Sequence, residues 1–322
     1  MTDTTFRWCF IGTGHLAEKV AKEITASGKH SIVSVYARRQ EPRNAFAKEY
    51  GAKSYDSAAA AMLDENVDGV YIVTPHTSHF EYAKMAVEFG KPVLCEKPFT
   101  VNNKQALELI ALAKEKNVYL VEAMWTWFSP IANQIKAWMD SGKFGDITEF
   151  KLHYRQDFAP RGGRLVDPNL AGGALLDIGV YAITYLYRLF GMPTAITCTG
   201  DVRGGVDYSE DITMTFPNGV TYEASVAFDD PEGEEVLIIK GTKGSVTIPW
   251  FHFANEVAFV GADGTEEVFT GDGSMLNEFN LVAEEIRAGL TESKYVPHQA
   301  TLDVLELMDA CREQMELRYP GE

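Results

Sequence analysis

Three side chains of this sequence could do acid–base chemistry: Lys97, Asp177 and Tyr181. Lys97 follows the apolar run 92–95, which is typical of a buried strand, and a lysine there can present its charge to a reaction centre. The alternative is a stem that extends along apolar surface to water. Asp177 and Tyr181 are four residues apart in an apolar segment, so they share a face if that segment is helical. An acid and a phenol on one face indicate a polar cluster, although Asp177 could be a helix cap and Tyr181 a core residue.

A tyrosine needs help to act as a base in neutral solution. Its pKa as a free side chain is about 10, which is too high for efficient catalysis near pH 7. A nearby ammonium group favours the phenolate and lowers that pKa. We therefore predict that Tyr181 gives or takes the proton, while Lys97 tunes it and polarises the substrate oxygen. The close alternative has Lys97 as the acid and Tyr181 as the orienting group.

A glycine-rich turn near the N-terminus predicts a nucleotide site. Residues 12–17 read G-x-G-x-x-A and lie between a strand-like run at 6–11 and a helical pattern at 15–27. Gly12 would permit the tight turn, Gly14 the approach of a pyrophosphate, and Ala17 close helix–strand packing, with the helix N-terminus facing the anion. An incidental glycine turn is the alternative, but the strand–turn–helix context favours a dinucleotide.

The residues after the second expected strand, 32–36, favour NADP over NAD. An NAD site usually has an acid at this place, to bind the ribose hydroxyls. Here the chain continues Ala37-Arg38-Arg39. Arg38 or Arg39 would bind a 2′-phosphate that an aspartate would repel. Either arginine could instead be surface charge alone, and NAD stays possible.

The first part of the chain alternates strand and helix patterns. Strand-like runs cover 6–11, 32–36, 52–55, 67–74, 92–95 and 118–121, with helical patterns between them. Ser78 with Glu81, and Asn102 with Gln105, have the spacing of capping boxes that begin helices. This order predicts an α/β Rossmann fold with a doubly wound parallel sheet over residues 1–123.

After Met124 the pattern changes. Helical patterns at 131–140, 174–190, 276–288 and 299–317 accompany strand-like runs at 147–155, 196–201, 212–216, 220–228 and 236–240. Pro217-Asn218-Gly219 and Ala262-Asp263-Gly264 read as hairpin turns. We predict that residues 124–322 form an α+β domain with a large, mostly antiparallel sheet, for substrate binding and oligomerisation.

Composition excludes several function classes. The net charge of −17 argues against nucleic-acid binding, which needs clustered basic residues. Apolar runs are broken well before about 18 residues, so no membrane span is expected, and residues 1–5 show no signal-type pattern. The four cysteines, at 9, 95, 198 and 311, lack metal or redox spacing. We expect a cytoplasmic protein with reduced, mostly buried thiols and no metal.

Together these motifs resemble the glucose–fructose oxidoreductase/inositol dehydrogenase (Gfo/Idh/MocA) family, and are most similar to its dimeric dihydrodiol dehydrogenase branch. The matching segments are Gly12–Ala17, Thr74-Pro75 with His79, Glu96-Lys97-Pro98, 122–126 and 172–181. The resemblance implies NAD(P)-dependent oxidation of a carbinol, or reduction of the carbonyl, on a small sugar, polyol or diol. It also implies a homodimer or homotetramer.

The resemblance assigns roles to individual residues. It implies Lys97 as the active-site lysine, Asp177 as a substrate-orienting acid and Tyr181 in the acid/base position. His79 and Trp125 would line the substrate pocket, although a histidine in the first turn of a helix is often structural. The residues expected to contact the cofactor are Gly12, Gly14, His15, Leu16, Arg38, Arg39, Thr74, Pro75, His79, Glu96 and Lys97.

One position departs from the branch, and two other functions compete. The branch often continues Trp-Thr-Arg where this chain has Trp125-Thr126-Trp127. The side chain of Trp127 could favour an apolar substrate face or simply pack. One rival is a nicotinamide-dependent glycoside hydrolase, which would show no net cofactor consumption. The other is a non-catalytic nucleotide-binding sensor, which would not need Lys97, Asp177 and Tyr181 together.

Overall fold

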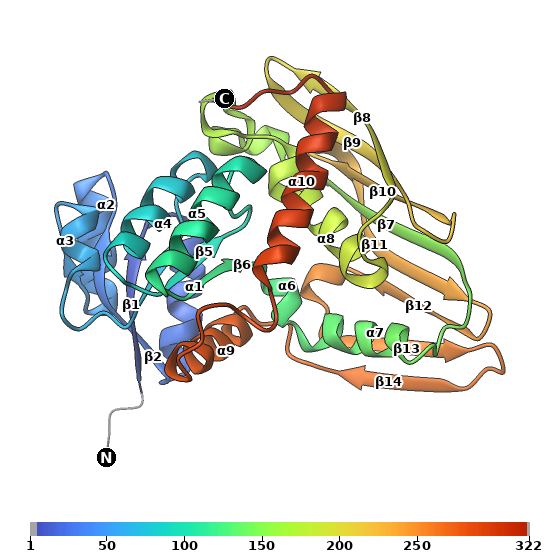
Figure 1. Ribbon diagram of the computed structural model, residues 1–322, viewed down its shortest axis with the longest axis horizontal. Coiled ribbons are helices and arrows are strands. Elements are labelled where there is room, and N and C mark those ends of the chain that lie inside the picture. The colour runs from blue at the N-terminus through green and yellow to red at the C-terminus, as the bar shows by residue number, and fades with distance from the viewer. Residues whose placement is uncertain (1–4, 321–322) are drawn as a thin grey trace. The chain divides into compact units, whose positions relative to one another are not determined.

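The computed structural model describes residues 5–320 and contains two compact units (Figure 1). The first unit comprises the chain up to residue 125 together with 275–302, and the second comprises 126–274 together with the segment from 303 onward. Residues 1–4, which belong to the stretch inspected for a signal pattern, lie outside the described residues. The functional division into 1–123 and 124–322 stays a prediction; the packing adds that 275–302 belongs with the first unit.

The first unit is built on six parallel strands in the order β3-β2-β1-β4-β5-β6. The order reverses between β1 and β4, which is the switch point where doubly wound sheets bind their ligands. Helices cover both faces, so β4, β5 and β6 are buried along their whole length. The predicted doubly wound sheet is confirmed. Its strands are β1 Phe6–Ile11, β2 His30–Tyr36, β3 Lys53–Ser54, β4 Gly69–Ile72, β5 Val93–Glu96 and β6 Leu120–Ala123.

By their contacts the helices of this unit form two groups, one with α1, α2 and α9 and the other with α3, α4 and α5. Their bounds are α1 His15–Ala26, α2 Gln40–Tyr50, α3 Ala58–Met62, α4 His79–Glu88, α5 Asn103–Lys116 and α9 Leu276–Arg287. At α5 the predicted cap is confirmed, because the Asn102 side chain accepts a 3.0 Å hydrogen bond from the backbone N–H of Gln105. The buried stripe of α5 is also as predicted, with Ala106, Leu109, Ile110 and Ala113.

The capping box predicted at Ser78 is wrong, although the helix does begin there. Ser78 makes no side-chain cap hydrogen bond, because it ends a 3₁₀ turn, η1 His76–Ser78, with φ −104° and ψ −6°. A capping side chain needs the extended backbone that Asn102 has, with φ −158° and ψ 164°.

The C-terminal segment 275–302 completes the first unit. The ring of Phe279 packs edge-on against Trp8 and Tyr71, with centroids 5.2 Å and 5.0 Å away. His30 Nε2 lies 3.2 Å from Asn280 Oδ1, and the hydroxyl of Tyr119 donates to Glu285 at 2.6 Å. Helix α10, His298–Gln314, then contributes residues to both units.

The second unit contains an eight-stranded sheet in the order β14-β13-β12-β11-β7-β10-β9-β8. All neighbours are antiparallel except β7 and β10, so the predicted mostly antiparallel sheet is confirmed. The strands are β7 Ile147–Asp157, β8 Ala195–Arg203, β9 Val206–Thr215, β10 Thr221–Ala227, β11 Asp229–Gly241, β12 Gly244–Pro249, β13 Glu256–Gly261 and β14 Glu266–Thr270. The two predicted hairpin turns link β9 to β10 and β13 to β14.

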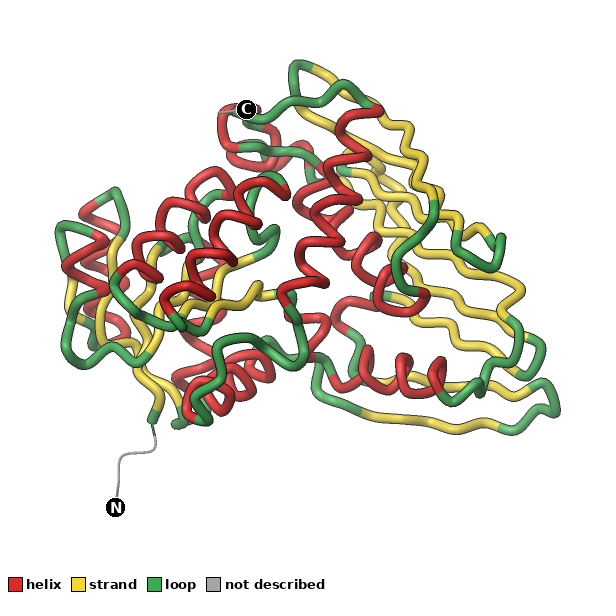
Figure 2. The backbone as a smooth tube through the Cα atoms, in the orientation of Figure 1, coloured by secondary structure: helices red, strands yellow, loops and turns green. Residues whose placement is uncertain are grey.

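Helices and strands segregate within this unit, as Figure 2 shows. Helices α7, Pro130–Asp140, and α8, Val180–Phe190, pack on one face of the sheet, and the short α6, Trp125–Phe128, precedes them. Strand β7 alternates accordingly: Leu152 and Tyr154 are buried on the helix-covered face.

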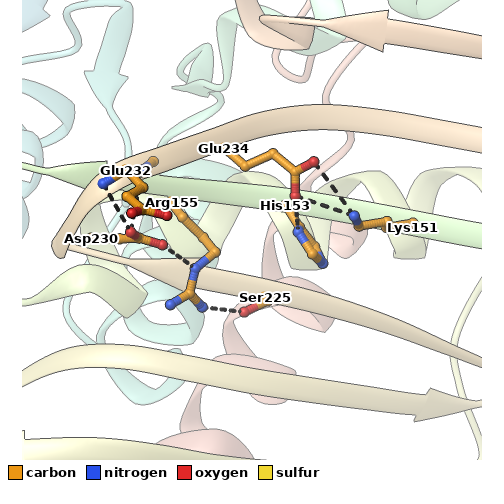
Figure 3. A network of polar contacts seen from close by, with 8 residues as sticks. Lys151, His153, Arg155, Ser225, Asp230, Glu232 and Glu234 are labelled. Carbon is orange, nitrogen blue, oxygen red and sulfur yellow. Dashed lines mark hydrogen bonds and ion pairs between the residues drawn. The ribbon is translucent and has the colours of Figure 1, made fainter.

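The opposite face of the same strand carries charge. There Lys151 and His153 contact Glu234, while Arg155 donates 2.7 Å hydrogen bonds to Asp230 and Ser225 (Figure 3).

One segment, Pro168–Phe190, has the length and apolar composition of a membrane span. Its most apolar window is 89% buried inside the protein, which is typical of a core helix.

Candidate active site

The turn after β1 has the geometry that a pyrophosphate requires. Gly12 has φ +118°, and a Cβ on it would collide with the carbonyl oxygen of Val73 at the end of β4. Gly14 caps α1 and would have nothing within 4 Å of a Cβ, so its backbone is open to a ligand. His15 and Leu16 begin the helix, whose first-turn N–H groups face the same space. These residues fit the phosphate cradle of a dinucleotide.

The end of β2 carries two exposed arginines. Arg38 and Arg39 follow Tyr36 and Ala37, and Arg39 is the N-cap residue of α2. The buried guanidinium of Arg43, which sequence reasoning missed, donates to the carbonyl of Ala37 at 3.2 Å. It also pairs with Asp56. This buried cation fixes the loop from which the two arginines project, and no pattern in the sequence marks it.

The loop that carries Lys97 is fixed by its neighbours. The Glu96 carboxylate accepts hydrogen bonds from the Tyr71 hydroxyl at 2.6 Å and from the backbone N–H of Lys97 at 3.2 Å. The peptide bond from Lys97 to Pro98 is cis. Lys97 itself is only partly buried, at the carboxyl end of β5. Its place at the end of a buried strand is therefore as the sequence predicts.

The side chain of His79 connects two loops through hydrogen bonds. It is fully buried, with Nδ1 2.8 Å from the carbonyl oxygen of Pro98 and Nε2 2.9 Å from that of Thr74. The ring thus joins the loop after β4, which contains Thr74 and Pro75, to the loop after β5, which contains Lys97. These contacts give His79 a positioning role, while its predicted contacts with substrate and cofactor stay predictions.

Glu122 is a second residue that sequence reasoning missed, although it lies in a segment that carries the family resemblance. One carboxylate oxygen accepts from the backbone N–H of Phe99 at 3.0 Å, and the other accepts from the Thr301 hydroxyl at 2.9 Å. Burial raises the pKa of Glu122 to about 7, against the opposing effects of these hydrogen bonds and of the Lys97 charge. Glu122 therefore anchors the loop that follows Lys97. Trp125, three residues on, is 4% exposed.

In the second unit, the expected regular helix over 174–190 is wrong at its start. Residues Leu175–Gly179 form a π-helical turn, η5, and α8 begins only at Val180. Asp177 lies in this wider turn, so the four-residue spacing to Tyr181 does not place the two as it would in an α-helix. Asp207 of β9 explains the local geometry, because its carboxylate accepts a 2.6 Å hydrogen bond from the backbone N–H of Leu175.

Gly173 makes that approach possible. Its φ is +143°, and a Cβ on it would collide with the Asp207 carboxylate. The Gly172-Gly173 pair is thus a structural requirement of the turn that carries Asp177.

The second unit gathers Asp177 and Tyr181 around Tyr154 of β7. Asp177 accepts from both terminal nitrogens of Arg164, at 3.3 Å and 3.4 Å. The ring centroids of Tyr181 and Tyr154 are 6.0 Å apart. Burial raises the pKa of the Tyr154 hydroxyl, and electrostatic interactions with Tyr181, Glu235 and Asp177 raise it further. Arg164, Tyr154 and Glu235 carried no sequence signal, since each comes from a segment without a motif.

Trp127, which replaces the arginine of the branch, packs inside the second unit. It stacks on Tyr187 at an interplanar angle of 10°, and the guanidinium of Arg188 lies 5.0 Å from the centre of its ring. Burial lowers the pKa of Arg188 to about 10. Of the two alternatives for Trp127, these contacts favour packing.

The predicted site residues therefore form two groups. Gly12, Gly14, His15, Leu16, Arg38, Arg39, Thr74, Pro75, His79, Glu96, Lys97 and Trp125 belong to the first unit, and Asp177 and Tyr181 to the second. Within residues 5–320, no group of three or more histidine, cysteine, aspartate or glutamate side chains could hold a metal ion. The four cysteines are free and buried.

Comparison with known proteins identifies the family. Residues 6–123 match the model of the oxidoreductase family with an NAD-binding Rossmann fold, and residues 132–247 match the GFO/IDH/MocA C-terminal domain. The chain belongs to the GFO/IDH/MocA oxidoreductase family. The resemblance inferred from the motifs is thereby confirmed, together with the expectation of an enzyme that uses a nicotinamide dinucleotide.

Relatives in the GFO/IDH/MocA family match along nearly their whole length. A trans-1,2-dihydrobenzene-1,2-diol dehydrogenase of Danio rerio is 30% identical, with 97% of this chain and 98% of the relative covered. A D-xylose 1-dehydrogenase (NADP(+)) of Hypocrea jecorina is 29% identical, with 98% and 93% covered.

A solved structure supports the fold. A 3-ketoreductase from Actinomadura kijaniata in complex with NADP has a TM-score of 0.85 at 23% identity, with 97% of this chain and 98% of that chain covered. The comparisons give no support to the glycoside hydrolase or to the sensor.

Proposed function

We propose that this protein is an NADP-preferring dehydrogenase or reductase that acts on a carbinol or carbonyl carbon of a sugar, polyol or diol. The observation that carries the proposal is the phosphate cradle at Gly12 and Gly14, in the same unit as the strand-end Lys97. The substrate class is supported by the relatives named for a diol and for D-xylose. The bound nicotinamide would supply or accept the hydride.

The side chains would then manage the proton and the orientation of the substrate. Tyr181 gives a proton to the substrate oxygen in reduction, or takes it in oxidation, and Lys97 polarises that oxygen. Asp177, held by Arg164, orients the substrate, and His79 and Trp125 line its site. Thr74, Pro75, Glu96 and Lys97 contact the cofactor, as do His15 and Leu16. The reverse assignment, with Lys97 as the acid, is the alternative.

The preference for NADP rests on Arg38 and Arg39. Both are exposed at the end of β2, and neither Tyr36 nor Ala37 supplies the acid that a ribose 2′-hydroxyl would need. A planar guanidinium binds a 2′-phosphate with charge-assisted hydrogen bonds.

The test is a comparison of kcat/KM for NADP⁺ and NAD⁺ with D-xylose, trans-1,2-dihydrobenzene-1,2-diol and myo-inositol. We expect stoichiometric NADPH formation with at least one of these alcohols and a higher kcat/KM for NADP⁺. A higher value for NAD⁺ would overturn the cofactor preference. Hydrolysis of a glycoside without net NADPH formation would overturn the dehydrogenase.

We also propose a separate role for each of the two parts of the chain. Residues 1–123 would bind the dinucleotide, and residues 124–322 would bind substrate and form a homodimer or homotetramer. The buried free thiols suit the reducing cytoplasm. Light scattering coupled to gel filtration tests the oligomeric state, and a monomer would contradict it.

A further inference from the structure

A buried chain of three side chains lies beside Tyr181. Glu235 of β11 faces Tyr154 of β7 in the sheet register, on the helix-covered side. His252, from the 3₁₀ turn η6 Phe251–Phe253 after β12, completes the set. Its backbone N–H donates to Glu235 Oε1 at 3.2 Å, its Nδ1 contacts the same oxygen, and its Nε2 lies 3.0 Å from the Tyr154 hydroxyl.

The chemistry of these groups sets the direction of the chain. An ionised carboxylate only accepts hydrogen bonds, so the imidazole Nδ1 that contacts Glu235 carries a proton. In the neutral ring Nε2 is then an acceptor, and the Tyr154 hydroxyl donates to it. The side chains of His252 and Glu235 are 10% and 1% exposed, and hydrogen bonds in such a dry environment strengthen one another.

The chain reaches Tyr181 through ring contacts. The Tyr154 and His252 centroids are 4.8 Å apart, and the Tyr181 centroid lies 6.0 Å from each. The three rings thus form a compact triangle, in which a displaced Tyr154 or His252 must disturb Tyr181. The charged groups that act on the Tyr154 hydroxyl include Glu235, Asp177 and Arg161.

We propose that Glu235, His252 and Tyr154 are positioning residues that hold Tyr181 in the orientation from which it exchanges its proton with the substrate. The inference rests on the proposed function, because it takes Tyr181 as the acid/base group. It adds to that function three residues that no motif marks.

The same two strands offer a matched control. His153 precedes Tyr154 in β7, and Glu234 precedes Glu235 in β11. These two residues form another histidine–glutamate contact, on the opposite face of the sheet (Figure 3). This second pair has the same chemistry and lies on the face away from Tyr181 and α8.

The test measures kcat, KM and the pH profile of kcat for Tyr154→Phe, Glu235→Gln, His252→Leu and His252→Gln. We expect kcat to fall about tenfold to a hundredfold, the loss typical of a displaced catalytic group, with Kd for NADP⁺ unchanged. His252→Gln should recover part of the loss of His252→Leu, since its amide can reach the Tyr154 hydroxyl. The basic limb of the pH profile should shift, which loss of packing alone would not cause. His153→Gln and Glu234→Gln should stay within about twofold of the parent.

The outcomes separate this inference from the proposed function. If Tyr181→Phe keeps kcat, the acid/base assignment fails. If Tyr181→Phe lowers kcat while the variants of Tyr154, Glu235 and His252 behave like the His153 and Glu234 controls, only the positioning role of these three residues is overturned.

A measurement that needs no turnover is the ¹⁵N NMR spectrum of the histidine rings. The proposed hydrogen bonds require a proton on Nδ1 of His252. In the Tyr154→Phe variant the ¹⁵N chemical shift of His252 Nε2 should change, while the shifts of His153 stay the same. A His252 ring with its only proton on Nε2 would overturn the chain.

Discussion

The two candidate proton-transfer groups, Lys97 and Tyr181, are supported in different ways. Around Lys97 the partners come from the ends of the parallel strands β5 and β6 and from the start of α4. The contacts run largely to backbone groups: Glu96 and Glu122 accept from backbone N–H groups, and His79 contacts two carbonyl oxygens. Around Tyr181 the partners are side chains from two strands and a 3₁₀ turn, and the contacts run ring to ring. The first arrangement depends on hydrogen bonds to the backbone, whereas the second depends on the packing of side-chain rings.

The largest expected effect would decide which of the two groups delivers the proton. Tyr181→Phe removes one hydroxyl and keeps the ring, and we expect kcat to fall by about 10²- to 10⁴-fold, the usual contribution of a general acid or base. Lys97→Ala should lower kcat strongly as well, with cofactor affinity changed only modestly.

The pH profile of kcat separates the two roles. If Lys97 tunes the tyrosine, the basic limb in Lys97→Ala moves to higher pH, because the phenolate has lost a neighbouring cation. A Tyr181→Phe enzyme with near-parental kcat would transfer the acid/base role to Lys97.

The next effect compares one glycine from each unit. Gly173→Ala forces a Cβ into the Asp207 carboxylate, so we expect the free energy of unfolding to fall by about 1–3 kcal/mol, with kcat lowered and NADP⁺ binding kept. Gly12→Ala places its Cβ against the Val73 carbonyl and should abolish NADP⁺ binding instead. Urea unfolding measures the free energy of unfolding of each variant, and fluorescence titration measures its binding of NADPH. Equal loss of NADPH binding in both variants would contradict the separation.

A smaller effect, on the pH dependence of stability, is expected for Glu122, which anchors the loop that follows Lys97. Its folded pKa, about 7, lies above its ordinary value of 4.5, so the folded state holds this proton more tightly. The stabilisation is fully present below pH 4.5 and is lost as the pH rises through 7, by at most about 3 kcal/mol. Glu122→Gln should therefore flatten the decline of stability between pH 5 and pH 8. Urea unfolding at both pH values tests this, with the exposed Glu65→Gln as control; an unchanged slope would show that Glu122 is ionised in the folded protein.

The smallest effect is expected at the surface. Arg38→Ala or Arg39→Ala should raise KM for NADP⁺ by about fivefold, because an exposed ion pair contributes about 1 kcal/mol, and should leave KM for NAD⁺ unchanged. Arg7→Ala, which breaks an ion pair with Asp68 elsewhere in the first unit, is the control. An equal rise for both cofactors would exclude the 2′-phosphate as the ligand.

This contrast also explains what could be predicted from the sequence. The cap and buried stripe of α5 depend on residues a few positions apart, so their patterns are visible in the sequence. The turn at Gly12 also has a local motif, although the need for glycine there comes from the distant Val73. The π-helical turn at Asp177 depends on Asp207, thirty positions away on strand β9, and no local pattern reports such a contact.

The residues proposed to position Tyr181 lie in segments that contain no recognisable motif. His252 is aligned by Glu235 and meets Tyr154, and the three come from separate elements whose pairing only the folded sheet reveals. Near Lys97, Glu122 lay within a recognisable segment, but its partner Thr301 comes from near the end of the chain.

The return of residues 275–302 to the first unit has a consequence for synthesis on the ribosome. Trp8, His30 and Tyr119 are made early, yet their partners Phe279, Asn280 and Glu285 emerge only after the whole eight-stranded sheet has been translated. A nascent chain that ends before α9 must leave this apolar surface uncovered, in the state that favours aggregation and chaperone binding. The N-terminal sheet can therefore begin folding first, but it is completed among the last parts of the molecule.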